Sequence, residues 1–177
     1  DALQQLQSKV QQSGEIGDWL KQQNLADAQP LWRAIQVEAG WETAVEAVLR
    51  ERLAALATDA ATARQAIAVP PPQTFSLALP DGAAARPAAA DSLRAKVRCD
   101  DAKWAAGLDD WLAGVACADS ADELAAATDG IKVSREGHLR SKHGLTLYVP
   151  DARIHGVIER QREIEELAAL IESRELE

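Results

Sequence analysis

The residues of this chain that could carry chemistry are three histidines, two cysteines and the carboxylates near them. His138 and His143 lie five residues apart, and Cys117 or Asp119 could complete a metal site with them. Common zinc sites instead use paired Cys or His ligands at short, regular intervals. We therefore expect no metal ligands here and interpret the histidines as exposed loop residues.

Nucleophilic chemistry would need a cysteine beside a base, for example Cys99 with His155. Cys99 falls on the apolar face of a predicted strand, where a thiol is usually inert packing. The chain has no phosphate loop of the form Gly-x4-Gly-Lys-Ser/Thr, and no Gly-x-Gly-x-x-Gly follows a predicted strand. We expect no catalytic residue and no cofactor within this chain.

Length and composition indicate one globular unit or two small ones: 177 residues, 47% hydrophobic and 27% charged. So apolar a chain is not expected to be disordered. Its apolar runs fall short of the ~20 residues of a membrane span. Two cysteines are too few for a disulfide framework, which favours a reducing, cytoplasmic setting. The chain begins at Asp1 without a leader, so we expect a piece of a longer protein.

The net charge of −9 argues against a nucleic-acid protein, but the charge is unevenly distributed along the sequence. Residues 131–162 carry +4 and the remainder −13. All three histidines lie in the same window. This segregation predicts a positively charged surface that could steer an anionic partner.

Both ends of the chain have the spacing of amphipathic helices. Val157, Ile164 and Ile171 recur every seven residues, which is the seam of a coiled coil. Near the N-terminus the apolar spacing is interrupted at Gly14 and Gly17. We predict an N-terminal coiled-coil helix over 1–26 and a C-terminal one over 153–177, packed antiparallel because neither is stable alone.

Between the ends, strand and helix patterns alternate, so we expect a mixed α/β body. Residues 93–99 alternate apolar side chains with Arg94, Lys96 and Arg98, which predicts a strand with one positive face. Further strands are expected at 34–37, 74–79, 131–133 and 145–149. The expected helices span 41–52, 59–67, 101–113 and 120–128.

An internal repeat divides this body. Trp41 and Trp104 each stand eight residues before a leucine, on one face of a predicted helix. Each helix is followed by a short apolar segment and then by an aspartate, Asp59 or Asp119, placed to cap the next helix. We predict subdomains at 27–90 and 91–152, with the boundary in the Pro- and Ala-rich connector 80–90.

Three stretches carry a family resemblance: Leu31 to Leu49, Ile131-Lys-Val-Ser-Arg-Glu-Gly-His138 leading to Gly144, and His155-Gly-Val-Ile-Glu-Arg-Gln-Arg-Glu-Ile-Glu-Glu-Leu167. With coiled-coil patterns at both ends and a duplicated α/β body, they resemble the hinge domain of bacterial, and in particular proteobacterial, SMC chromosome-segregation proteins. The resemblance covers nearly the whole chain. It implies two similar subdomains, flanked by an antiparallel coiled-coil stub.

This resemblance implies a homodimerisation hinge that joins two long coiled-coil arms for chromosome condensation and segregation. ATP, Mg²⁺ and kleisin-type subunits are expected only at head domains absent from this chain, and the location would be the nucleoid. In the family, a strand of one second subdomain adds to the sheet of the partner's first, and an unpaired edge suits this. The implied interface residues are Gly137, Gly144, Leu145, Leu147, Tyr148, Phe75 and Leu77.

The resemblance also implies weak, sequence-independent contact with the DNA backbone. The candidate residues are Arg94, Lys96, Arg98, Arg135, Arg140, Lys142 and Arg153. Aromatic side chains that would favour single strands are few, with Trp104 and Tyr148 the candidates.

Other interpretations stay open from sequence alone. The two terminal helices could pack on the body of a scaffold or adaptor that binds no DNA. A zinc-hook end of a repair ATPase would need a Cys-x-x-Cys, which the chain lacks. An enzyme of nucleotide metabolism is a further alternative. A dimer of about 38 kDa, twice the 19.0 kDa chain, would favour the hinge, and a monomer the adaptor.

Overall fold

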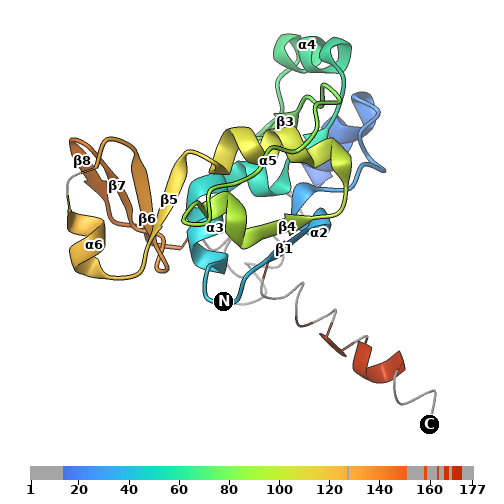
Figure 1. The fold of residues 1–177 in the computed structure, drawn as a ribbon. Helices are drawn as coiled ribbons and strands as arrows, with labels where there is room; N and C mark the ends of the chain where they lie inside the picture. The colour runs from blue at the N-terminus through green and yellow to red at the C-terminus, as the bar shows by residue number, and fades with distance from the viewer. Residues whose placement is uncertain are drawn as a thin grey trace, which may run out of the picture.

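The fold repeats one order of elements in two halves, in a computed structural model that describes residues 14–126, 128–150, 158, 163, 166–167 and 169–172 (Figure 1). The first half follows a helix over residues 14–22 and comprises α2 (Leu31–Ala34), β1 (Ile35–Val37), α3 (Glu42–Leu49), η1 (Arg50–Ala54), β2 (Leu56–Ala57), α4 (Ala60–Ala68) and β3 (Leu77–Ala78). The second comprises η2 (Leu93–Lys96), β4 (Val97–Cys99), η3 (Ala102–Trp104), α5 (Ala105–Leu112), β5 (Val115–Ala118), α6 (Ala121–Ala125), β6 (Ile131–Ser134), β7 (Leu139–Ser141) and β8 (Gly144–Thr146). The mixed helix and strand architecture is as predicted.

The repeat predicted from the two tryptophans is present in the structure. Trp41 and Trp104 occupy the N-cap positions of α3 and α5, and both are 1% exposed. Leu49 and Leu112 end the same two helices and are also buried. Each helix then leads into a βαβ unit, since β2 pairs in parallel with β3, and β5 with β6.

The two halves are joined by antiparallel pairing of β1 with β4. Ile35 lies opposite Cys99, and Val37 opposite Val97. One hydrophobic cluster contains side chains of both halves, including Trp41, Leu53, Trp104 and Leu112. The division at residue 90 stays a prediction, because the core is continuous across it.

Several predicted boundaries are wrong for local reasons. The strand expected over 93–99 begins only at Val97, because Ser92 accepts a hydrogen bond from the Ala95 amide and starts the 3₁₀ helix η2. The strand expected over 74–79 is limited to β3, and that over 145–149 starts and ends earlier, as β8. The helix expected over 41–52 becomes 3₁₀ at Arg50, whose φ is 51°.

The caps of the second helix in each half differ from one another. Asp59 caps α4 as predicted, accepting from the Thr62 amide at 2.7 Å. At α6 the prediction that Asp119 is the N-cap is wrong. Ser120 caps the helix and accepts from the Glu123 amide at 3.1 Å. The chain thus enters α6 one residue later than the repeat suggested.

The terminal helices are described only in part. The helix over 14–22 runs through Gly17, so the predicted interruption there is wrong. Its Trp19 is buried, and the indole Nε1 donates to the Val69 carbonyl at 2.7 Å. Leu3, Leu6, Val10 and most of 151–177 lie outside the described residues, so the coiled-coil stub stays a prediction.

Gly137 is fixed by a close approach within the chain. Its φ is +90°, and a Cβ added there would lie 2.6 Å from the Tyr148 ring and 2.8 Å from Ala47 on α3. Gly137→Ala should therefore lower the free energy of unfolding by about 2–4 kcal/mol, through backbone strain and overpacking. Urea denaturation followed by circular dichroism measures this.

Gly130→Ala is the matched control, because a Cβ at Gly130 meets nothing within 4 Å. We expect the free energy of unfolding of that variant to lie within about 0.5 kcal/mol of that of the parent chain. Equal stability of the two variants would contradict the packing described for Gly137.

Candidate self-association edges and charged surface

The second half ends in a sheet with an open edge. Its strands run in the order β5-β6-β7-β8, and within the described residues β8 pairs only with β7. Apolar side chains on and just after β8 are exposed: Leu145 at 53%, Leu147 at 69% and Val149 at 82%. An unpaired strand with exposed apolar side chains is a template for pairing with another chain.

The turn between β6 and β7 braces the segment after β8. Gly137 is buried against the Tyr148 ring, and the Tyr148 amide donates to His138 Nδ1 at 2.9 Å. Gly137, an implied interface residue, thus makes its close contacts within this chain, to Tyr148 and Ala47. Gly144 is exposed at the start of β8, and its carbonyl accepts from Arg140 Nη1 at 3.3 Å.

The first half presents the other predicted edge, at β3. Leu77 is half-buried, while Phe75 packs edge-on to Trp19 with ring centroids 5.7 Å apart. Phe75 therefore supports the N-terminal helix and lies just before the strand. Leu79, which belongs to the same alternation in the sequence, is 57% exposed.

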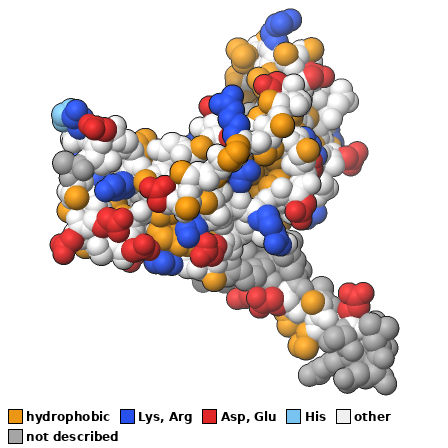
Figure 2. Space-filling view, viewed as in Figure 1, with side chains coloured by type: hydrophobic (Ala, Val, Ile, Leu, Met, Phe, Trp, Pro, Cys, Tyr) orange, Lys and Arg blue, Asp and Glu red, His pale blue; other side chains and the backbone are white. Residues whose placement is uncertain are grey.

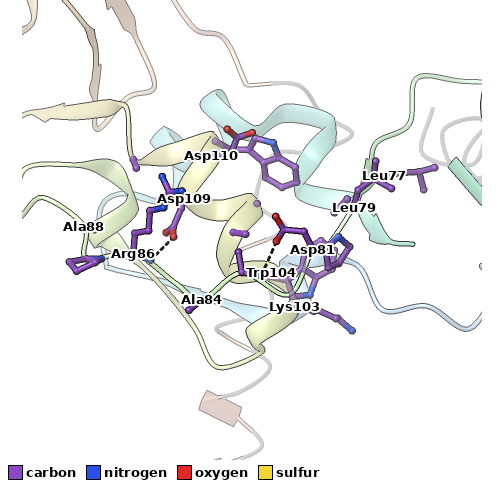
Figure 3. A pocket seen from close by; sticks show the side chains of 18 residues that line it. Leu77, Leu79, Asp81, Ala84, Arg86, Ala88, Lys103, Trp104, Asp109 and Asp110 are labelled. Atoms are coloured by element: carbon purple, nitrogen blue, oxygen red, sulfur yellow. Dashed lines mark hydrogen bonds between the residues drawn. The ribbon is translucent and has the colours of Figure 1, made fainter. Parts of the chain in front are cut away.

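A hollow of about 670 Å³ lies beside β3, between that strand, the connector and α5 (Figure 3). Leu77 and Leu79 line it from the strand, and Trp104 and Trp111 from the helix side. The connector is held in place because the Arg86 amide donates to Asp109 at 2.7 Å, drawn as a dashed line. The β3 edge is thus bordered by space and by apolar side chains.

The three cations predicted to share a strand face are separated by the structure. Arg94 is 12% exposed and pairs through Nε with Asp109 at 2.7 Å. Lys96 pairs with Glu38 at 3.1 Å, and Arg98 bonds to Gln36 on β1. The prediction that these three cations share one face of a strand is wrong, because Arg94 and Lys96 lie on η2 and only Arg98 lies on β4.

The cations of the second-half sheet also have partners nearby. Arg135 donates to Asp119 at 3.2 Å and lies 4.5 Å from the centre of the Trp41 ring. Lys142 pairs with Asp129 at 3.4 Å. Arg140 folds over its own turn and donates to the Ser141 carbonyl. Arg153 and His155 lie outside the described residues.

Among the described residues of the 131–162 window, Arg135 and Lys142 each pair with an acidic side chain. Figure 2 shows basic and acidic side chains interspersed over the face in view. The acidic partners Asp119 and Asp129 flank α6, just before the basic strands.

Both thiols are free; Cys117 is buried and Cys99 is half-buried. Desolvation raises the pKa of Cys99, and it raises the pKa of Cys117 to about 11. Thiolate nucleophiles need the opposite shift. Within the described part of the chain, no group of three or more His, Cys, Asp or Glu side chains could hold a metal ion.

None of the helices among the described residues has the length and apolar character to cross a membrane.

Comparison with known proteins identifies the class. The family described as "SMC proteins Flexible Hinge Domain" matches residues 24–126. The chain is 41% identical to the chromosome partition protein Smc of Burkholderia pseudomallei and 37% identical to that of Thauera aminoaromatica. These alignments cover 99% of this chain, but 16% and 18% of the relatives.

Solved structures share the fold. An asymmetric dimer of the Geobacillus stearothermophilus SMC hinge domain matches with a TM-score of 0.65 at 20% identity, over 97% of this chain and 80% of that one. The Pyrococcus furiosus Smc hinge domain with an extended coiled coil matches with a TM-score of 0.56 at 16% identity, over 99% and 72%.

The chain belongs to the SMC hinge family, so the predicted resemblance is confirmed. It spans less than a fifth of the length of the curated Smc relatives described above.

Sequence reasoning missed two features of these surfaces. The pairing of Arg94 with Asp109 had no signal in the sequence, because it joins η2 to α5 across the fold. Arg33 lies outside the basic window 131–162 and the predicted strand 93–99, so no sequence pattern pointed to it. Leu79 belongs to the predicted strand 74–79 but was not among the implied interface residues.

The burial of Arg94 predicts a structural role. Arg94→Met leaves the 11% exposed Asp109 carboxylate without its guanidinium partner, and should lower the free energy of unfolding by about 2–4 kcal/mol. Urea denaturation at pH 7 measures the loss. Arg98→Met is the control, because Arg98 is exposed and bonded to a neutral glutamine, and should cost under about 0.5 kcal/mol. Similar costs for both variants would contradict the assignment.

The raised pKa of Cys117 predicts slow alkylation of the native chain. A pKa of about 11 against an ordinary 9.0 leaves about a hundredfold less thiolate at neutral pH. Iodoacetamide labelling read by mass spectrometry should be fast only in urea. Because the folded thiol keeps its proton where the unfolded thiol loses it, stability should also fall as pH rises from about 9 to 11, and less so in Cys117→Ala. Rapid labelling without urea would contradict this.

Proposed function

We propose that this chain is a homodimerisation hinge, in which β8 of one copy pairs beside β3 of a second copy. The observation that carries the proposal is the open β8 edge with Leu145 and Leu147 exposed. The hollow beside β3 supports it, because it offers apolar side chains next to a strand whose outer edge is unpaired in the described residues. The Geobacillus relative is itself a dimer.

The placement of the two edges favours a reciprocal dimer. In Figure 1, β8 lies at the outer end of its sheet, away from β3. One copy therefore cannot satisfy both of its own edges, whereas two copies related by a two-fold axis can satisfy all four. Burial of the exposed leucines supplies the driving force, since each gains about 1.5–3 kcal/mol when fully buried.

In the longer protein, this dimer would join two coiled-coil arms for chromosome condensation and segregation. ATP, Mg²⁺ and kleisin-type subunits would act at head domains beyond this chain, and the assembly would lie on the nucleoid. The names of the Smc relatives support this role. The hinge itself would contribute association rather than catalysis.

Weak contact with the DNA backbone is a second proposed function. Arg98, Arg135 and Lys142 are exposed, and each could meet a phosphate. Their acidic neighbours and the net charge of −9 make the expected binding weak and sensitive to salt.

Charged residues on the β8 edge should separate the dimer. Leu145→Lys with Leu147→Lys places two cations in the proposed interface, so the mass by light scattering should fall from about 38 kDa to the 19.0 kDa of one chain. Thr146→Lys is the matched control, because it adds a charge on the same strand but on the opposite face. A parent chain that is monomeric at micromolar concentration would overturn the proposal and favour the adaptor.

Complementation tests the pairing of the two edges. Leu79→Lys should also separate the dimer, because Leu79 borders the β3 hollow. Mixing this variant with the Leu145→Lys/Leu147→Lys variant leaves one intact contact per mixed pair, so a mixed dimer should form. Absence of any mixed dimer would contradict pairing between β8 and β3.

A further inference from the structure

A second hollow, of about 700 Å³, shares Lys103 and Trp104 with the hollow beside β3 and is lined by no residue of β8. We call it the arginine hollow: it is formed by α2, β1, β4 and η3, and its polar lining includes Gln29, Arg33, Gln36, Arg98, Asp101 and Lys103. Ala34, Ile35 and Trp104 supply an apolar floor. Figure 1 shows α2, β1 and β4 side by side, away from β8.

The two arginines of this hollow are paired with neutral groups. Arg33 Nη1 donates to Gln29 Oε1 at 2.9 Å, and Arg98 Nη2 donates to Gln36 Oε1. Gln36 lies directly opposite Arg98 in the β1–β4 ladder. The glutamines therefore orient both guanidinium groups without neutralising them.

The remaining charges of the hollow leave it positive. Lys103 pairs with Asp101 at 3.3 Å, and Asp101 also caps η3 by accepting from the Lys103 amide. Asp100 lines the rim as the second acid. Three cations against two carboxylates give a formal charge of +1 in a chain whose net charge is −9.

Trp104 lines both this hollow and the hollow beside β3 and is 1% exposed. Its indole Nε1 is buried without a hydrogen-bond acceptor in the described part of the chain.

We propose that the arginine hollow binds a phosphate group, held by the guanidinium groups of Arg33 and Arg98 with Lys103 beside them. Each guanidinium has five donors in a planar fork, so the two can meet several oxygens of one tetrahedral oxyanion. A carboxylate, with two oxygens, is satisfied by a single arginine. The phosphate is that of a DNA backbone or of a free phosphate ion.

This inference deepens and rests on the proposed contact with DNA, but it moves that contact to residues outside the predicted set. Arg33 and Lys103 were not among the sequence candidates, and of those candidates only Arg98 lines this hollow. Arg33 and Arg98 line the arginine hollow but not the hollow beside β3, so substituting them should leave the proposed dimer intact.

The test is the double variant Arg33→Gln/Arg98→Gln. Anisotropy of a short labelled oligonucleotide, single-stranded and duplex, should show at least about tenfold weaker binding, with the salt slope reduced by about 0.9 per lost phosphate contact. Inorganic phosphate, titrated by NMR, should shift the amides of residues 33–36 and 98–104 in the parent chain only. Arg33→Lys/Arg98→Lys should bind between the two, because charge is kept and the fork is lost.

The matched control is Lys21→Gln/Arg64→Gln, which removes the same charge from two exposed cations outside both hollows. It should bind like the parent chain, and every variant should keep the dimer mass. Oligonucleotide binding lost equally in both double variants, with no phosphate shifts, would overturn the arginine hollow while leaving DNA contact in place. Phosphate shifts without oligonucleotide binding would keep the hollow as a site for free phosphate and overturn the DNA contact instead.

Discussion

The antiparallel pairing of β1 with β4 is the contact on which the rest of the structure depends. It joins a strand of the first half to its counterpart in the second, which is the arrangement expected when two similar halves are related by a two-fold axis. The pairing brings α3 and α5 into one core, with Trp41 and Trp104 buried at their N-caps. Arg135, lying over the Trp41 ring, then fixes the turn of the second-half sheet against the first half.

Within the described residues, the same arrangement leaves two sheet edges unpaired. β8 ends one sheet with its leucines exposed, and β3 ends another beside a hollow. Gly137, packed on Tyr148 and Ala47, positions the chain just beyond β8. A molecule whose core is complete and whose edges are open is suited to associate with another copy, and the SMC hinge family is one in which solved members include a dimer.

Unlike the packing of the core, the pairing of charged side chains does not follow their order in the sequence. Two of the cations that the sequence concentrates at 131–162 pair with acids that flank α6: Arg135 with Asp119 and Lys142 with Asp129. Exposed pairs of this kind stabilise little, but they reduce the field available to a polyanion. The arginine hollow differs, because its guanidinium groups are oriented by glutamines and keep their charge.

The sequence by itself determined the mixed fold, the repeat of Trp41 and Trp104, the Asp59 cap and the family, because these depend on local spacing and on short-range hydrogen bonds. It could not determine where β4 begins. The alternation of apolar and basic residues predicts a strand from Leu93 onward, whereas the Ser92 cap starts a 3₁₀ helix over the same residues. Tertiary structure alone decided which of the cations on η2 and β4 pair with a carboxylate. Arg94 and Arg98 look equivalent in sequence, yet packing of α5 brings Asp109 to the first and leaves the second facing Gln36, since burial and pairing depend on residues distant along the chain.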